Sequence, residues 1–426
     1  MLAGFARAWK VPELRRKIGF TLGILLLYRL GAHIPVPGVP FQDLYGAYST
    51  TFSQNGALAV VNLFSGGALS RMSVFALGIM PYITAQIILQ MMQAVIPSLG
   101  ELMKEGEAGQ RKMTQYTRYL TIVLALINAI GYLFLFLGYG VSFDGLGYIP
   151  AGLEYVIVVF TMLVGAVIIM WMGEDITQHG VGNGMSLIIF VNIMAGIPSA
   201  LISSVTSTGN VVLTIVTLLV VVAVIPLIVY VERGQRRIPV QYAKRVVGRR
   251  IMGGQNTYLP IKVNTAGVVP IIFASAVLYL PAQLSVFFPT VGWIQAFANA
   301  LSAGWINWLL SVVLIVLFAY FYTSMVFNPD ETADQLKKTG GFIPGVRPGA
   351  ATAAYIKSTI DHITLPGAIF MAALAVIPTI IFWFTGNSLI QSFGGTSVLI
   401  MVGTAMDTLS SLESQLKMHN YDGFFK

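Results

Sequence analysis

The chain has 426 residues, of which 56% are hydrophobic and only 10% are charged, and its net charge is +8. This composition excludes a soluble globular protein, because most segments lack the polar side chains that would cover a water-facing surface. The chain has no cysteine, so disulfides, thiol chemistry and a cysteine-based metal site are excluded as well.

Apolar stretches long enough to cross a hydrocarbon core of about 30 Å as helices recur along the whole chain. Ten are predicted, at 17–34, 73–93, 117–138, 153–172, 184–204, 210–231, 267–284, 303–327, 364–384 and 394–414. The basic N-terminus followed by an apolar run is also typical of a signal peptide. Arg29, His33, Pro35 and Pro37 stand where a small-residue cleavage site would lie, so we expect the first helix to be retained.

The basic residues predict the orientation, because Lys and Arg near the ends of spans stay on the cytoplasmic side. Of the 25 Lys and Arg, 23 lie in the segments 1–17, 94–118, 232–264, 328–362 and 415–426. With ten spans, these segments and a short turn at 173–183 share one side, so both termini are predicted to be cytoplasmic. Basic loops also bind nucleic-acid phosphates, and that interpretation of 232–264 stays open here.

Two spans carry the same proline-interrupted pattern. Residues 78–83 and 267–272 share the order Gly-apolar-apolar-Pro-apolar-Ile, five predicted spans apart. Interrupted segments in corresponding positions are typical of an inverted repeat, here two five-helix halves, 1–208 and 209–426. Proline bends are also common in membrane helices without symmetry, so the repeat is a hypothesis.

A short apolar stretch at 57–64 precedes the second span and is broken by Ser65, Gly66 and Gly67. It is too short to span a membrane. It is either a short re-entrant helix packed inside the protein or an ordinary outer loop with one apolar turn.

Catalytic motifs are missing from the sequence: there is no Walker A sequence, no His-Glu-x-x-His and no Gly-x-Ser-x-Gly. An enzyme is therefore not expected, and a small-solute transporter with inverted repeats is the main alternative from another class. The glycine-rich 180–184 stretch follows a span rather than a strand, which indicates a tight turn. Arg29 and Asp407 are the charges that lie away from the ends of predicted spans, and their depths differ, so we expect structural polar contacts and not a mutual pair.

Several motifs together resemble the SecY family of protein-conducting channels. They are FSGGALSR at 64–71, FALGIMPYI at 75–83, VERGQRRI at 231–238, FNP at 327–329 with ETAD at 331–334, GVRPG at 345–349 and FGGTS at 393–397. The resemblance covers both halves in matching order. It implies an all-α membrane protein of ten transmembrane helices in two pseudo-symmetric halves, with a short plug helix in the first half and large cytoplasmic loops in the second.

The resemblance implies an hourglass with an apolar pore ring at Ile79, Ile83, Met185, Ile189, Ile272 and Ile400. Aliphatic side chains at a narrow neck can gate by dewetting without binding any one sequence. The first four form two i, i+4 pairs, each on one helical face. For any single apolar residue in a membrane helix, lipid contact or helix packing is the alternative. Met185 replaces the isoleucine usual in the family, which implies a more pliable seal.

The family also implies a plug and a lateral gate. The plug segment is residues 57–71, with Asn62, Leu63, Phe64, Ser65, Gly66, Gly67 and Arg71 as its site residues. The gate lies between spans 2 and 3 and spans 7 and 8, with Thr84, Gln86, Gln90 and Asn264 as polar residues whose hydrogen bonds would hold it shut. Gln86 is bulkier than the small residue expected there.

The loops at 232–264 and 328–362 resemble the loops that dock a motor or the ribosome. The predicted contacts are Arg236, Arg237, Arg249, Arg250 and Arg347, and the alternative is that they only fix topology. The implied function is to conduct unfolded polypeptides across the bacterial plasma membrane and to release signal or transmembrane segments into the lipid bilayer. The implied partners are the small subunits SecE and SecG, the SecA motor ATPase, the ribosome and signal-bearing substrates, without any cofactor.

Overall fold

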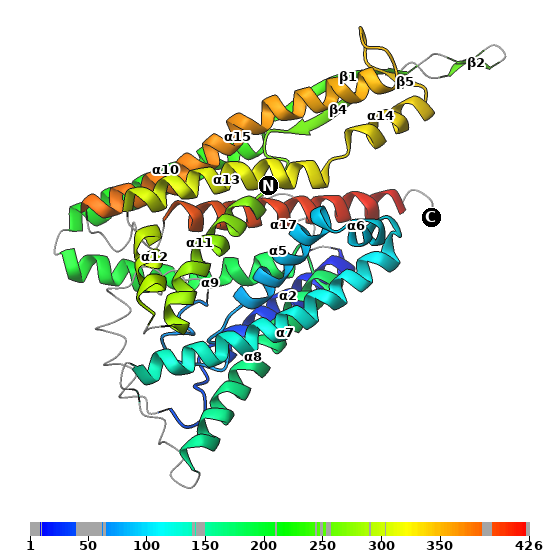
Figure 1. The fold of residues 1–426 in the computed structure, drawn as a ribbon. Coiled ribbons are helices and arrows are strands. Elements are labelled where there is room, and N and C mark those ends of the chain that lie inside the picture. Colours follow the sequence, from blue (N-terminus) through cyan, green and yellow to red (C-terminus); the bar gives the residue numbers. More distant parts are fainter. Residues whose placement is uncertain are drawn as a thin grey trace.

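The protein is a mostly helical molecule whose long helices pack side by side, with a strand-bearing unit at one end (Figure 1). The structure is a computed structural model, and it describes residues 9, 11–39, 62, 65–138, 141, 150–208, 211–242, 245–247, 250–252, 257–288, 291–302, 304–385 and 394–422.

Each predicted span overlaps one helix. The corresponding helices are α2 (Pro12–Gly31), α5 (Met80–Val95), α7 (Glu107–Gly138), α8 (Ala151–His179), α9 (Gly184–Thr208), α10 (Val211–Glu232), α11 (Val269–Phe287), α13 (Gly304–Val326), α15 (Ala350–Thr385) and α17 (Gly395–Asp422). Shorter helices are α6 (Pro97–Lys104), α12 (Gly292–Ser302) and α14 (Pro329–Lys338). In the described part of the chain, six helices are long and apolar enough to cross a membrane.

Two segments have a different local structure from the predicted one. The second span was predicted from residue 73, but α5 begins at Met80, because Ser73 forms a β-bridge with Pro35 and residues 74–79 form turns in which Gly78 has a φ of +57°. The segment 173–183 was predicted as a turn, but α8 continues to His179. The tight turn before α9 is confirmed: it is short, Gly182 has a φ of +76°, and the Oδ1 atom of Asn183 accepts a hydrogen bond of 3.0 Å from the Met185 amide.

The two proline-containing patterns have the same local geometry. Gly78 and Gly267 have φ values of +57° and +62°, in the left-handed region that favours glycine. The residue after each glycine is the N-cap, with φ and ψ of −93° and −5° before α5 and of −86° and −14° before α11. In both helices proline is the second residue, where its missing amide proton costs nothing. The shared sequence pattern therefore marks two equivalent helix starts.

The segments predicted as two separate basic loops fold into one unit. Strand β1 (Gln235–Tyr242) lies between β4 (Thr257–Lys262) and β5 (Gly341–Phe342), antiparallel to both. Its register places Arg237 opposite Pro260 and Tyr242 opposite Gly341. The prediction of an all-α chain is wrong here, because Ile238 and Val240 alternate with exposed residues as a half-buried strand requires.

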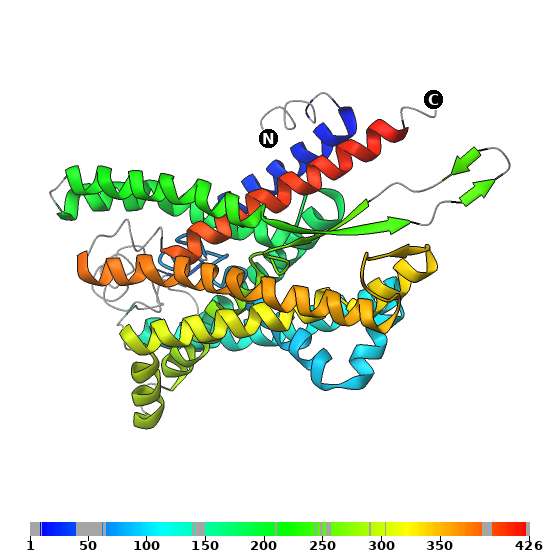
Figure 2. The same ribbon diagram turned by 90° about the horizontal axis from the view of Figure 1, so that it is seen from above.

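A small apolar core joins the strands to the following helices. It consists of Ile238, Ile261, Ile343, Ile356 and Ile360, all buried. Beyond this core, the short ribbon of β2 (Arg245–Val247) and β3 (Arg250–Met252) extends away from the helices (Figure 2). The strand-bearing unit is therefore built from both 232–264 and 328–362.

The main core lies where helices from both parts of the chain meet. Helix α11 contacts α5, α7, α13 and α17, so it bridges early and late helices. Elsewhere large apolar side chains face outward, as Leu27 of α2, Leu219 of α10 and Trp171 of α8 do. Extended apolar surface of this kind is what lipid covers.

Candidate functional site

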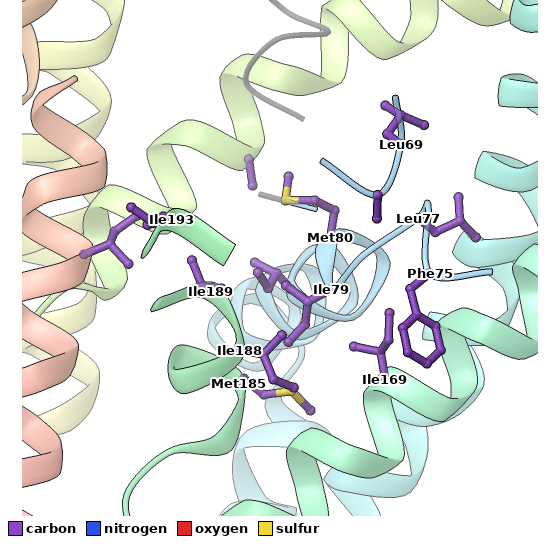
Figure 3. Close-up of a cluster of buried hydrophobic side chains, with 14 of the residues drawn as sticks. Leu69, Phe75, Leu77, Ile79, Met80, Ile169, Met185, Ile188, Ile189 and Ile193 are labelled. Carbon is purple, nitrogen blue, oxygen red and sulfur yellow. The ribbon is translucent and has the colours of Figure 1, made fainter. Parts of the chain in front are cut away.

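The predicted ring residues lie in one apolar cluster. Ile79, Ile83, Met185, Ile189 and Ile400 are buried members of it, and Ile272 packs against it. They come from four helices, α5, α9, α11 and α17. Figure 3 shows Ile79, at the start of α5, beside Ile188 and Ile189 of α9. The structure thus gathers these side chains, but the cluster also contains many ordinary core residues.

Local backbone structure positions the ring residues that come from α5 and α9. Ile79 is the N-cap of α5, and its carbonyl accepts a hydrogen bond of 3.1 Å from the Ile83 amide, so the two side chains lie one turn apart. Met185 and Ile189 share a face of α9 in the same way. The Met185 side chain lies against Gly173 of α8, where a Cβ atom would collide with its sulfur. The flexible thioether fills a gap that only a glycine leaves open.

The described part of the plug segment is folded back on itself. The Asn62 Oδ1 atom accepts a 3.0 Å hydrogen bond from the Ser70 amide, and the Asn62 carbonyl accepts bonds from the Gly67 amide at 2.8 Å and the Ser65 hydroxyl at 3.0 Å. Residues 65–71 form turns, so the predicted short plug helix does not extend into them. Residues 57–61, Leu63 and Phe64 lie outside the described residues.

The plug segment is connected to α2. Arg29 Nη1 donates a 2.8 Å hydrogen bond to the Gly66 carbonyl. The expectation that Arg29 makes a structural polar contact is confirmed. Just beyond the plug segment, Val36 and Ile34 exchange backbone hydrogen bonds of 2.9 Å with Met72 and Val74, which fixes where this segment ends.

The predicted gate residues lie on α5 and just before α11, two helices that contact each other. Thr84, Gln86 and Gln90 are half-buried on α5, and Asn264 is half-buried just before α11. The Asn264 Nδ2 atom donates a 3.0 Å hydrogen bond to the Gly267 carbonyl, within its own segment. Among the described residues, the buried oxygens of the Gln90 and Asn264 amides have no hydrogen-bond partner. A hydrogen-bonded seam across the gate therefore stays a prediction.

Asn264 also borders a polar cavity of about 340 Å³. Its charged lining comes from Glu232 at the end of α10, Lys262 of β4 and Asp407 of α17, together with Arg233 and Glu413. Asp407 therefore lines this cavity and does not pair with Arg29, as we expect from the different depths of the two residues in the predicted spans. The cavity lies at the end of α10 that leads into the strands.

The predicted docking arginines are divided between two parts of the strand-bearing unit. Arg236 and Arg237 are exposed on β1, and Arg347 is exposed in the turn that precedes α15. The Arg347 carbonyl accepts a 2.9 Å hydrogen bond from the Thr352 hydroxyl, which anchors this turn to the helix. Arg250 begins β3, but its side chain lies outside the described part of the structure, as does all of Arg249.

Two residues at this site were missed by the sequence analysis. Asn192 of α9 is fully buried and lies against Gly66. Tyr28 of α2 is fully buried and its ring stacks on Phe75, with centroids 5.6 Å apart. A polar asparagine inside an apolar span is a detectable signal, because such side chains join membrane helices, whereas the tyrosine stack depends on tertiary structure.

Comparison with known proteins agrees with this arrangement. A family model described as SecY matches residues 73–409. The protein translocase subunit SecY of Streptomyces coelicolor is 46% identical over 450 positions, and that of Mycobacterium tuberculosis strain H37Rv is 47% identical over 443; both alignments cover all of both chains.

Solved structures share the fold at low sequence identity. One described as a protein conducting channel has a TM-score of 0.64 and 20% identity, and the match covers 93% of this chain and 91% of the other. Sec61 in the canine ribosome-channel complex from the endoplasmic reticulum has a TM-score of 0.58 and 19% identity, with the same coverage.

The fold is therefore that of the protein-conducting channels. Because the family model covers most of the chain, and relatives are nearly half identical over its full length, the chain belongs to the SecY family of protein translocase subunits.

Proposed function

We propose that this protein is the central channel subunit of a protein translocase. It conducts unfolded polypeptides across the bacterial plasma membrane and releases signal or transmembrane segments into lipid. In a chain of the SecY family, one observation carries the proposal. Apolar side chains from α5, α9, α11 and α17 converge beside the plug segment, which is folded back on itself by its own hydrogen bonds.

The ring and the plug segment form the resting seal. Ile79, Ile83, Met185, Ile189, Ile272 and Ile400 line the narrow neck, which sheds water because aliphatic side chains offer it no hydrogen bonds. Their flexible side chains yield to a passing polypeptide whatever its sequence. A solved structure in which the SecY plug domain is described as maintaining a membrane seal has this fold, with a TM-score of 0.63 at 20% identity.

The lateral gate lies between α5 and α7 on one side and α11 and α13 on the other. Helix α11 contacts both α5 and α7, so the two sides meet at α11. The buried amide oxygens of Gln90 and Asn264 have no hydrogen-bond partner among the described residues, which supports a seam that few hydrogen bonds hold shut. An apolar signal helix that enters the gate gains lipid contact and displaces few protein hydrogen bonds.

The strand-bearing unit is the docking platform for the energy source. Arg236, Arg237 and Arg347 expose positive charge on one folded body. Arg249 and Arg250, which lie at the start of β3 in the sequence, are proposed to add to it. Exposed charges contribute little to folding but direct encounters with a charged partner. The platform would receive the SecA motor ATPase or the ribosome, and SecE and SecG would be the accompanying small membrane subunits.

The membrane arrangement follows from the same assignments. All ten long helices span the bilayer, and both termini are cytoplasmic. The chain consists of two halves, 1–208 and 209–426, and α5 and α11 are the second spans of these halves. The matching glycine and N-cap geometry of α5 and α11 supports the two halves. The concentration of Lys and Arg in the strand-bearing unit supports a cytoplasmic position for it.

Reconstitution tests the proposed function. Vesicles containing this chain with SecE and SecG should import a signal-bearing precursor when SecA and ATP are added, and should not do so without the chain. Protease protection of the precursor measures import. Vesicles that stay impermeable to the precursor but show substrate-coupled flux of a small solute would contradict the channel and favour a transporter.

A further inference from the structure

Gly66 of the plug segment is in contact with side chains from two helices. Arg29 of α2 donates its 2.8 Å hydrogen bond to the Gly66 carbonyl. A Cβ atom on Gly66 would lie 2.6 Å from Asn192 Oδ1 and 2.8 Å from Arg29 Nη1, so the position has no room for a side chain. Its φ of +65° also favours glycine. The plug backbone thus fits closely between α2 and α9.

The hydrogen bond of Arg29 can form only when the plug segment is in its closed position. A charge in an apolar helix is costly and usually serves a function. None of the ion pairs among the described residues involves Arg29, and its hydrogen bond goes to a backbone carbonyl. A charge-assisted bond is stronger than a neutral one. Because the acceptor is a backbone atom, the bond depends on the position of the plug and not on its side chains.

The end of α2 that carries Arg29 is firmly placed. Tyr28, which is fully buried, stacks on Phe75 with an interplanar angle of 9°. A Cβ atom at Gly31 would collide with the same phenylalanine ring, so α2 packs tightly against the segment that follows the plug. Asn192 is fully buried on α9. Both contacts to Gly66 therefore come from side chains on fixed helices.

We propose that Arg29 and Asn192 are positioning residues that hold the plug closed through the backbone of Gly66. Their contacts set how readily the channel opens at rest and how apolar a signal sequence must be to open it. This inference rests on the proposed channel function. Both residues act on the channel through the plug segment.

The test compares each variant in two backgrounds, the full chain and the chain lacking residues 57–71. Both are reconstituted with SecE and SecG in planar bilayers, and resting ion conductance is measured. Arg29→Ala should raise the conductance of the full chain about tenfold, because loss of one charge-assisted hydrogen bond shifts a two-state equilibrium by about that factor. Asn192→Ala should change it in the same direction. Neither should add to the leak of the plug-deleted chain, since the effect passes through the plug.

Two control variants test whether the effect depends on the charge of residue 29 and on its position in α2. Arg29→Lys keeps the charge and a donor, so it should restore most of the seal. Leu30→Ala alters the next residue of α2, whose side chain is 58% exposed, and should leave conductance at the parental level. Export of a precursor with a shortened apolar signal core should rise with Arg29→Ala and not with Leu30→Ala.

The outcomes distinguish the inference from the function on which it rests. The role of Arg29 would be overturned if Arg29→Ala raised the resting conductance equally in the full chain and in the plug-deleted chain. It would also be overturned if Arg29→Ala kept the parental conductance while plug deletion raised it. A tight seal after plug deletion would overturn the proposed channel arrangement itself. If Arg29→Ala does not fold, Gly66→Ala provides the test, because its Cβ must displace Arg29 or Asn192; a parental seal in that variant overturns the inference.

Discussion

At the scale of single residues, the apolar ring is the feature whose chemistry most directly predicts a phenotype. Ile83 and Ile189 are 5% and 1% exposed, and both lie in the main apolar cluster. Replacing both by Asn should wet the neck and let ions pass at rest, because amide side chains give water the hydrogen bonds that aliphatic ones deny it. Planar-bilayer conductance of the double variant measures this.

The ring prediction needs a background in which the plug cannot compensate. In a chain that lacks residues 57–71, the double variant should conduct more than the plug-deleted parent. If the two proteins show the same ion conductance, the assigned ring does not line the pore.

A second residue-scale prediction concerns the turn between α8 and α9. The Thr21 hydroxyl of α2 accepts a 3.1 Å hydrogen bond from the buried Val181 amide and donates one of 2.9 Å to the Lys17 carbonyl. Thr21→Val keeps the shape but leaves the Val181 amide unpaired, which should lower the free energy of unfolding by about 1–3 kcal/mol. Thermal unfolding in detergent, followed by circular dichroism, measures the loss.

Thr161→Val is the matched control for this substitution. The Thr161 hydroxyl donates only locally, to the Ile157 carbonyl at 2.7 Å, so its removal leaves no donor unpaired. The control should unfold close to the parental temperature. Equal shifts in the two variants would mean that the Val181 contact adds nothing.

At the scale of elements, hydropathy predicted the helices well and the irregular segments poorly. All ten predicted stretches overlap a helix, because apolar length is a property of the sequence itself. The start of α5 was placed too early because 74–79 is apolar but folds as turns. The strands were missed because Ile238 and Val240 give only a short alternation among charged residues. The Arg29–Gly66 contact joins residues far apart in sequence, which no local pattern contains.

The contact between α5 and α11 gives the element-scale prediction. A signal core of about ten buried leucine-like residues gains about 3 to 6 kcal/mol in lipid, whereas one interhelical hydrogen bond is worth about 0.6 kcal/mol. The gate should therefore open when a signal helix arrives. One cysteine placed in α5 and one in α11 at their contact can lock it without background, since the chain has no cysteine.

The crosslink length separates a blocked gate from a damaged protein. A short crosslink should stop export of a signal-bearing precursor, while reduction or a long spacer should restore it. Export at the parental rate through a tightly locked gate would exclude lateral opening from the mechanism.

At the scale of the whole molecule, the strand-bearing unit joins distant segments into one body. Pairing of β1 with β5 and the shared core of Ile238, Ile261, Ile343, Ile356 and Ile360 fix the 328–362 segment against 232–264. The exposed arginines of both segments are thereby held on a common scaffold. A partner docked there can transmit force to α10, α11 and α15, which continue directly from the unit.

Arg347 is the best single residue with which to test that docking. It is exposed, and only its backbone carbonyl bonds to the Thr352 hydroxyl, an acceptor that Arg347→Glu retains. One exposed charge contributes about 0 to 1 kcal/mol to stability, but its reversal places like charges against a partner that recognises a cation. Arg347→Glu should therefore abolish SecA-driven import while leaving membrane insertion and thermal stability unchanged. Lys357→Glu, an exposed charge reversal on α15 in the same segment, is the control and should import far better. Normal ATP-dependent import by Arg347→Glu, or equal loss in both variants, would show that Arg347 is not a specific docking residue.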